Sequence, residues 1–276
     1  MPELPEVETI KEAMRKAVSG NKIESVTVCN RHLRCLIPAD FEKSLCGAKI
    51  TRIYRIAKYA LMELDNGYTV IWHFGMSGKL KIIKEKNLVL EKHDHAVIKT
   101  SDCTIIYNDP RRFGVLTICK TAKLFENPLF CHLGLDPFDE NLSEVYLKEK
   151  LAHKKIPIKV ALLDQSIISG IGNIYASEAL YDARISPLRE SSSLKKKELK
   201  KLIGSIRLVL SKAIKAGGST LHDYHKPDGS TGYFQLQHCV YGKEGQCCPH
   251  CTCGTGKIIK LVQAGRSTYY CNHLQK

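Results

Sequence analysis

The sequence lacks a long hydrophobic run, because no segment reaches the roughly 18 uncharged apolar residues that a membrane-spanning helix needs. Charged residues occur throughout the first 20 positions, which excludes a secretory signal and predicts a cytoplasmic protein. Acidic residues are in deficit: 28 Asp and Glu oppose 42 Lys and Arg, a formal net charge of +14. So positive a surface repels itself unless a polyanion binds it, which makes DNA, RNA and anionic lipid the candidate partners. Lipid fits poorly, because no basic segment has a broad Trp or Phe face.

Disulfide bonds are not expected, although the chain has 12 cysteines, because the predicted compartment is reducing. We interpret seven scattered cysteines as small core residues. These seven are Cys29, Cys35, Cys46, Cys103, Cys119, Cys131 and Cys239. The other five lie within the last 30 residues, where their clustering suggests a metal site. They are Cys247, Cys248, Cys251, Cys253 and Cys271.

Hydrophobic periodicity divides the 276 residues into a β-rich part and a helical part. Apolar residues at helical spacing predict an amphipathic helix over 5–19, which ends at Gly20. Short β-branched runs separated by turn signals fill residues 22–120 and predict a β-sandwich or barrel. The helical period then returns from about residue 140 to 216. We therefore expect an α+β protein in which the N-terminal helix packs against the β-sandwich.

Composition predicts three successive parts. Residues 1–135 would form the β-sandwich domain, 136–236 a helical domain that includes a Gly- and Ser-rich loop, and 237–276 a small cysteine-rich hairpin. Ser193 is a plausible N-cap for the last long helix.

The extreme N-terminus offers unusual chemistry. Removal of Met1 would expose the secondary amine of Pro2, which can attack an aldehyde-level carbon and form an iminium ion. Glu3 and Glu6 add carboxylates suited to proton transfer, and Lys58 would lower the pKa of the amine if it lies close. The structural alternative is that Pro2 and the carboxylates only start the helix, and that Lys58 is an ordinary surface charge.

Segments along the whole chain resemble the formamidopyrimidine-DNA glycosylases, relatives of endonuclease VIII. In chain order, the matching segments are Met1–Thr9, Ala57–Tyr59, His73–Gly78, Lys92–His95, Asp109–Gly114, Gly170–Glu178, Gly217–Thr220 and the terminal cysteine hairpin. The resemblance implies a helix–two-turn–helix DNA-binding domain and a zinc-finger-type hairpin. It also implies an enzyme that excises damaged bases and then cleaves the strand by β- and δ-elimination.

The resemblance assigns catalysis to four residues. Pro2 would be the nucleophile at C1′ of the damaged nucleotide, and Glu3 the general acid/base at the sugar. Lys58 would donate a proton and contact phosphate. Arg266, at the tip of the hairpin, would reach the phosphates at the lesion and act late in elimination.

Further residues are implied in DNA binding. Met76, Arg111 and Phe113 match the trio that fills the gap left by a flipped base, although without the resemblance Met76 and Phe113 would be expected in the core. The other implied DNA contacts are His93, Arg112, Lys155 and Asn173. Of these, Asn173 follows a Gly-rich turn at a helix start, which suits a phosphate.

The resemblance also places Glu6, Ser219 and Thr220 at the flipped lesion, with the loop from Gly217 closing over it. The segment from Leu4 to Glu6 is closer to the branch that removes oxidised purines such as 8-oxoguanine and formamidopyrimidines. An enzyme for oxidised pyrimidines and a non-catalytic DNA-binding descendant are the alternatives. We expect duplex DNA as the partner of a monomeric, bacterial, nucleoid-associated protein.

The terminal cysteines predict one structural zinc ion. Cys248 and Cys251 form one knuckle and Cys271 begins a second, but Leu274 stands where the family has its fourth cysteine. His273 is the preferred fourth ligand. The other candidates are Cys253, Cys247 and His250. In the rival interpretation, the metal is lost and packing alone holds the hairpin.

Overall fold

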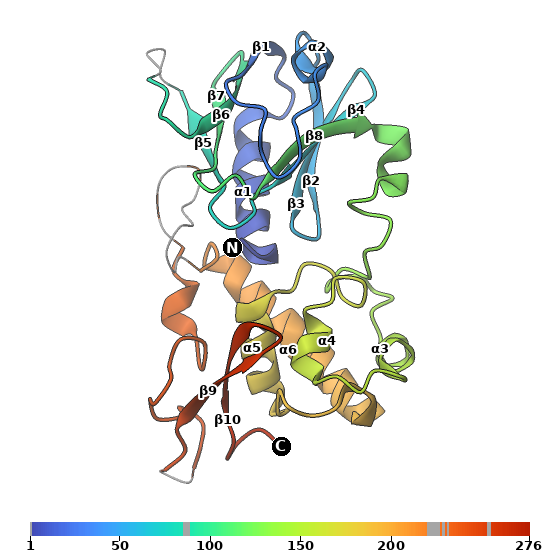
Figure 1. The fold of residues 1–276 in the computed structure, drawn as a ribbon, viewed down its shortest axis with the longest axis vertical. Helices are drawn as coiled ribbons and strands as arrows, with labels where there is room; N and C mark the ends of the chain where they lie inside the picture. The colour runs from blue at the N-terminus through green and yellow to red at the C-terminus, as the bar shows by residue number, and fades with distance from the viewer. Residues whose placement is uncertain (1, 85–88, 220–226, 228–229, 231, 253–254) are drawn as a thin grey trace. The chain divides into compact units, whose positions relative to one another are not determined.

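A computed structural model describes residues 2–84, 89–219, 227, 230, 232–252 and 255–276 (Figure 1). It consists of two compact units. The first contains Met1–Cys131 and Ala216–Gln235, and the second contains His132–Lys215 and Leu236–Lys276. Sequence composition grouped residues 216–235 with the helices, whereas their contacts place them in the first unit.

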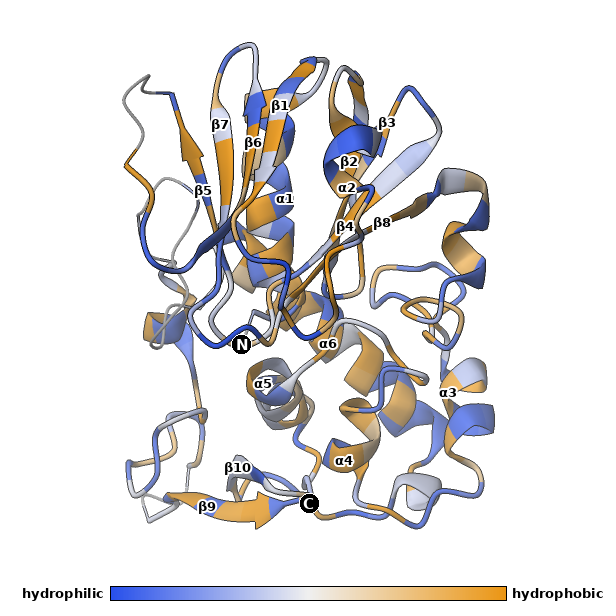
Figure 2. Cartoon of the chain, turned by 45° about the horizontal axis from the view of Figure 1, so that its top comes forward, coloured by the Kyte–Doolittle hydropathy of each residue, from blue (hydrophilic) through white to orange (hydrophobic). Residues whose placement is uncertain are grey.

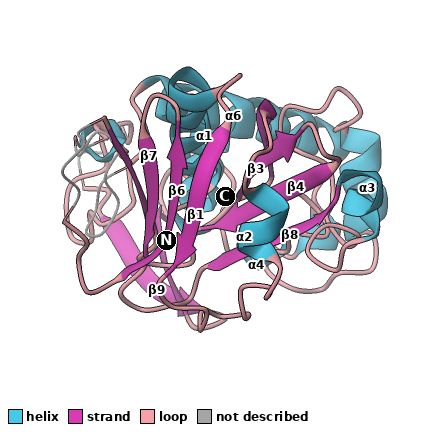
Figure 3. Cartoon of the chain, turned by 90° about the horizontal axis from the view of Figure 1, so that it is seen from above, coloured by secondary structure: helices cyan, strands magenta, loops and turns pink. Residues whose placement is uncertain are grey.

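The first unit contains two antiparallel four-stranded sheets, which Figure 3 shows from above. One sheet has the order β1-β6-β7-β5 and the other the order β2-β3-β4-β8. The strands are β1 (Ile23–Val28), β2 (Ile50–Ile56), β3 (Tyr59–Leu64), β4 (Tyr68–His73), β5 (Lys79–Ile83), β6 (Asp94–Thr100), β7 (Thr104–Asn108) and β8 (Val115–Lys120). All eight coincide with β-branched runs of the sequence, so the predicted sandwich is confirmed.

Helix α1 (Leu4–Val18) packs against β2, β3 and β5 and so contacts both sheets. Its fully buried face presents Val7, Ile10 and Met14 to a core that includes Trp72 and Tyr107. Figure 2 shows hydrophobic stretches, coloured orange, on α1 and on the strands of both sheets. The predicted helix over 5–19 is therefore confirmed. Short elements of the described chain that were not predicted include α2 (Phe41–Leu45) and the 3-10 helices η1 (Thr121–Glu126) and η3 (Phe234–Gln237).

The second unit is built on four helices: α3 (Glu144–Leu151), α4 (Ile158–Leu162), α5 (Asn173–Ala183) and α6 (Lys196–Lys215). α5 and α3 both pack on α6, and α4 packs on α5. The prediction that Ser193 caps α6 is wrong, because Ser193 ends the 3-10 helix η2 (Ser191–Ser193). Glu198 instead accepts a hydrogen bond from the backbone N–H of Lys195, ahead of the first turn.

The chain ends in a hairpin of β9 (Ile258–Gln263) and β10 (Arg266–Cys271), which packs on α5. Ala264 and Gly265 form the turn with φ angles of 47° and 71°. Positive φ at both positions is the conformation of a type I′ turn, whose twist matches that of paired strands. Arg266 is therefore the first residue after the turn, at the tip of the hairpin as predicted.

The assignment of the scattered cysteines to the core is largely wrong. Cys103 is buried, and Cys119 and Cys239 are half-buried. The exposed members are Cys29, Cys35, Cys46 and Cys131. These four lie in turns or beyond strand and helix ends, where hydrophobic periodicity carries no information.

Within the described residues, no helix is long and apolar enough to cross a membrane.

Candidate catalytic and nucleic-acid-binding site

The start of α1 buries the two residues with the most unusual predicted chemistry. Pro2 is buried and the Glu3 side chain is only 3% exposed. Glu3 is the N-cap of α1 and forms a capping box with Glu6, whose Oε2 accepts the backbone N–H of Glu3 at 2.8 Å. The helix dipole at this end favours negative charge. The sequence thus places a proline and a carboxylate side by side at a fixed, buried position.

Glu6 also anchors the first residues of the proposed lesion loop. Its second oxygen, Oε1, accepts the backbone N–H of Ser219 at 2.8 Å. Gly218 has a φ of +81°, and a Cβ there would come within 2.8 Å of the same oxygen. Only glycine fits this approach without strain. Glu6 therefore joins α1 to Gly218 and Ser219, while Thr220 lies outside the described residues.

Lys58 lies in the tight turn between β2 and β3, directly after Ala57, whose φ is 51°. Arg55 holds this turn against α1: its Nε pairs with Glu8 Oε2 at 2.8 Å and its Nη1 donates to the carbonyl of Ala57 at 2.9 Å. Lys58 is only 8% exposed, so it is not the ordinary surface charge of the alternative interpretation.

His73, at the end of β4, lies in the electrostatic field of Lys58. Burial first, and then the positive charges of Lys58 and Arg34, lower the pKa of His73 to about 4. Its Nδ1 accepts the backbone N–H of Gly75 at 3.1 Å. His73 is therefore neutral at pH 7 and connects the Lys58 turn to the next loop.

Two loops, 74–78 and 109–114, are held together by the carboxylate of Asp109, which is fully buried. Its Oδ1 accepts the hydroxyl of Ser77 at 2.6 Å and its Oδ2 accepts the N–H of Gly114 at 2.8 Å. Gly75 packs so closely on the backbone of Phe113 that a Cβ would come within 2.5 Å. Hydrogen bonds from a carboxylate and direct backbone contact thus fix the two loops as one scaffold.

This scaffold exposes the three side chains that sequence assigned to a flipped-base gap. Met76 is 40% and Phe113 is 47% exposed, so neither is the core residue of the alternative interpretation. The guanidinium of Arg111 lies 4.9 Å from the ring centroid of Phe113. Arg112 is also exposed, with a left-handed φ of 55°. His93 is half-buried, and its carbonyl accepts the N–H of Asp109 at 3.1 Å.

In the second unit, the first residue of α5 contacts the terminal hairpin. Asn173 Nδ2 donates to the carbonyl of Ser267 at 2.9 Å and to the hydroxyl of Tyr241 at 3.3 Å. Ser267 follows Arg266, which is exposed. The structure thus brings Asn173 next to the strand that carries Arg266. Lys155 is also exposed, in the segment between α3 and α4.

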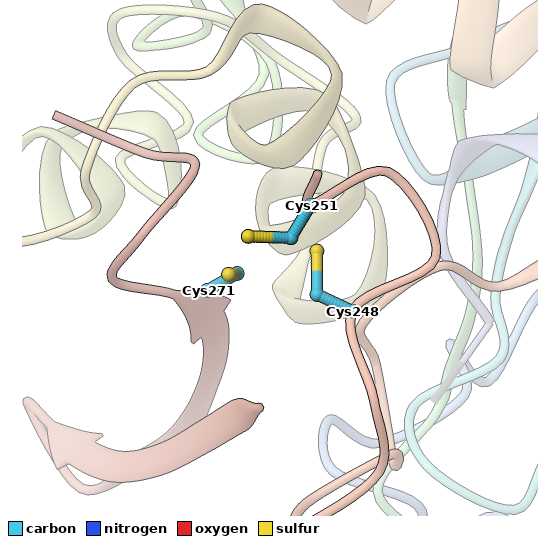
Figure 4. Close-up of side chains that lie close together, drawn as sticks. All are labelled: Cys248, Cys251 and Cys271. Carbon is cyan, nitrogen blue, oxygen red and sulfur yellow. The ribbon is translucent and has the colours of Figure 1, made fainter. Parts of the chain in front are cut away.

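Three of the four predicted metal ligands converge. The sulfur atoms of Cys248, Cys251 and Cys271 lie within 4.8 Å of one another, and their thiol groups point toward a common centre (Figure 4). His273 is exposed and is not part of this cluster in the described chain. Leu274 instead packs against the apolar residues around the thiols.

The donors around Cys248 favour its thiolate. The Tyr181 hydroxyl lies 3.1 Å from its Sγ. Although burial raises the pKa of Cys248, hydrogen bonds from Tyr181, backbone groups and Cys271 outweigh it and lower that pKa. Thiolate is the form that binds zinc, so this donor set fits the metal.

Sequence reasoning missed three buried polar residues that position these groups: Asp109, Lys159 and Glu178. The Glu178 carboxylate accepts three consecutive backbone N–H groups, those of residues 239–241, at 2.8 to 3.0 Å. Lys159 and Glu178 are charged residues at helical positions that hydrophobic periodicity assigns to the interior. That mismatch is the signal that would have identified them.

A β-sandwich with a buried Pro-Glu terminus, and a helical unit with a cysteine hairpin, define the class of DNA-repair glycosylase folds. Residues 1–116 match the formamidopyrimidine-DNA glycosylase N-terminal domain and residues 133–225 match the corresponding H2TH domain. The chain belongs to the formamidopyrimidine-DNA glycosylase family.

Curated relatives match the sequence of this chain over their full length. The chain is 46% identical over 277 residues to formamidopyrimidine-DNA glycosylase of Wolbachia pipientis wMel and 43% identical over 294 residues to that of Bartonella henselae, with complete coverage of both chains in each case. Among solved structures, a Lactococcus lactis Fpg mutant bound to Fapy-dG-containing DNA matches with a TM-score of 0.90 and 36% identity, again with complete coverage of both chains. The same enzyme bound to DNA with an abasic site matches equally well.

Proposed function

We propose that this chain is a base-excision-repair DNA glycosylase and AP lyase that removes oxidised purines from duplex DNA. The observation that carries the proposal is the pair Pro2 and Glu3, buried together at the start of α1. The similarity to formamidopyrimidine-DNA glycosylases over the whole chain, including a neighbour bound to Fapy-dG-containing DNA, supports the substrate class.

The reaction begins with Pro2 once Met1 is removed. Its secondary amine attacks C1′ and the glycosidic bond between C1′ and the base nitrogen breaks. The base leaves with the electron pair of that bond and gains a proton. Opening of the sugar ring gives an iminium ion between Pro2 and C1′, with Glu3 exchanging the proton at the ring oxygen. The iminium is an electron sink: loss of a C2′ proton expels the 3′ phosphate, and a second elimination expels the 5′ phosphate.

DNA is held by residues of both units. Met76, Arg111 and Phe113 fill the gap that the flipped nucleotide leaves, which offsets part of the cost of unstacking. Lys58 contacts phosphate near the lesion and donates a proton, and Arg266 assists the late elimination. The remaining proposed phosphate contacts are His93, Arg112, Lys155 and Asn173. Glu6 and Ser219 are the proposed lesion-recognition residues, together with Thr220, which lies outside the described residues.

The proposed functional parts are 1–135, 136–236 and 237–276, although their contacts group residues 216–235 with the first compact unit. The protein works as a monomer on nucleoid DNA. Cys248, Cys251 and Cys271 would hold one zinc ion, with His273 as the candidate fourth ligand. The ion would supply a structural cross-link at the base of the hairpin that carries Arg266.

A second candidate substrate is oxidised pyrimidine. It is supported by a Lactococcus lactis Fpg neighbour bound to DNA that contains an oxidised pyrimidine, with a TM-score of 0.90. Excision assays on both lesion classes in the same duplex sequence distinguish the two specificities.

Borohydride trapping on 8-oxoguanine duplexes tests the nucleophile. Pro2→Gly should slow trapping and base release by orders of magnitude while DNA binding survives, because glycine offers only a primary amine. Pro5→Ala is the matched control, since it also alters the first turn of α1 but keeps the amine of Pro2. Peptide mapping should place the trapped DNA on the N-terminal peptide, and attachment to a lysine peptide would refute the assignment.

A further inference from the structure

Lys159, in α4, is fully buried in the second unit. Its ammonium group lies within hydrogen-bond distance of three oxygens: Asn173 Oδ1 at 2.5 Å, Thr268 Oγ1 at 2.8 Å and the Ser267 carbonyl at 3.0 Å. Lysine is seldom buried to this degree, because removing its charge from water is costly. The bonds to these oxygens offset that cost and join α4 to α5 and β10.

The ammonium fixes which way the Asn173 side chain faces. A lysine ammonium has three donors and no acceptor, so it binds the oxygen of an amide and repels the NH2 group. With Oδ1 held by Lys159, Nδ2 faces the Ser267 carbonyl and, at the longer distance of 3.3 Å, the Tyr241 hydroxyl. A turned amide would place its oxygen against the Ser267 carbonyl oxygen and would also repel a phosphate. The observed orientation keeps the NH2 group on this side, and the long bond to Tyr241 is the one that a phosphate oxygen could share or replace.

The same ammonium immobilises the strand next to Arg266. Thr268 accepts from Lys159 and donates to Gln263 Oε1 at 2.9 Å, across the hairpin. Gln263 in turn donates to the Pro187 carbonyl at 3.2 Å. Arg266 lies at the turn between Gln263 and Thr268, so this buried chain of hydrogen bonds holds both strands beneath it.

We propose that Lys159 is a positioning residue for DNA phosphate binding: it orients the Asn173 amide as a donor. The proposal rests on the proposed function in one respect, the phosphate contact of Asn173. Lys159 itself has no access to DNA, since it is fully buried. It acts through Asn173, so its contribution to binding depends on that side chain.

A double-mutant cycle tests the dependence on Asn173. Lys159→Met, Asn173→Ala and the double variant are compared in the full chain, with Kd measured by anisotropy on a duplex that carries a tetrahydrofuran abasic analogue. Loss of one hydrogen bond to a charged phosphate weakens Kd by about 10- to 100-fold, and we expect this range for each single variant. The double variant should bind about as weakly as Asn173→Ala alone, because both substitutions remove the same contact.

Arg207→Met is the matched control for loss of stability. Its guanidinium is bonded to the carbonyls of Pro137, Asp139 and Leu142, within the same unit. This variant should lower Tm with little change in Kd. If Lys159→Met fails to fold, Lys159→Ala, which removes every side-chain donor and leaves room for water, carries the same cycle.

Two outcomes would overturn the inference: losses that multiply in the double variant, or a Lys159 variant that, like Arg207→Met, lowers only Tm. Failure of the proposed function is distinguishable, since the unaltered protein would then not bind or cleave the lesion duplex.

Discussion

Asp109→Asn should uncouple the two loops that expose the proposed gap-filling side chains. The Asp109 carboxylate accepts one hydrogen bond from Ser77 and one from Gly114, and it is fully buried. Asparagine keeps only one acceptor oxygen. If that oxygen faces Gly114, the NH2 group meets the Ser77 hydroxyl, which already accepts the N–H of Arg111 at 3.2 Å. The hydroxyl hydrogen then has lost its acceptor in a site without water access.

The magnitude follows from these contacts. A hydrogen bond to a charged group contributes about 1.5–3 kcal/mol, and an unsatisfied buried donor costs a similar amount. Losing one such bond and weakening the other should destabilise the first unit by about 3 kcal/mol. For a unit of this size, that loss lowers Tm by roughly 6–12 °C. Excision of 8-oxoguanine should fall by at least about tenfold, because a gap-filling side chain displaced by about 1 Å loses its geometry.

Differential scanning fluorimetry and single-turnover excision measure the two effects. Asp65→Asn is the matched control: the same chemical change, in the same unit, at an exposed aspartate whose Oδ1 accepts one bond from the N–H of Lys49. It should change stability by less than about 0.5 kcal/mol. Unchanged Tm and undiminished excision in Asp109→Asn would refute the role of the carboxylate as the link between the loops.

The remaining predictions concern Lys58, His73 and Cys248. Lys58→Ala should reduce excision from intact 8-oxoguanine duplexes more than cleavage of pre-formed abasic sites; equal losses would mean a general phosphate contact. The pKa of His73 is about 4 in the folded protein and ordinarily 6.5, so the unfolded chain gains a proton between these values and stability falls as pH drops from 6.5 to 4. His73→Asn keeps an acceptor for the N–H of Gly75 but does not titrate. Its free energy of unfolding, measured with denaturant, should therefore differ less between pH 5 and pH 7.5 than that of the unaltered protein. An equal difference in both proteins would contradict the lowered pKa of His73. Metal analysis should find about one zinc per chain, and chelation or Cys248→Ser should weaken DNA binding before it unfolds the protein; full activity without zinc would show that packing alone holds the hairpin.

The sequence by itself determined the long N-terminal helix, the strands of the sandwich and the identity of the motifs. The β-strand runs between residues 22 and 120 and the helix over 5–19 were predicted almost to the residue, because period 2 and period 3.6 are local properties of the chain. Ser193 was misassigned as a cap because several small polar residues near a helix start can serve as caps. Only the observed backbone decides among them.

The structure decided what is buried and what is exposed. Met76 and Phe113 have apolar side chains that sequence alone would place in a core, yet both are exposed, whereas Lys58 is buried. Tertiary packing reverses the expectation for Met76 and Phe113 because Asp109 and the close approach of Gly75 hold the loop backbones beneath them.

No local sequence pattern predicts the long-range polar contacts. Glu6 and Ser219 are 213 positions apart, and Lys159 reaches Thr268 across 109 positions. Nothing in the neighbouring residues encodes such a partner, since each bond exists only after the segments have packed. The sequence therefore determined which chemical groups the protein carries. Only the tertiary structure decided which of them are held in fixed orientations, because a hydrogen bond depends on distance and direction in space.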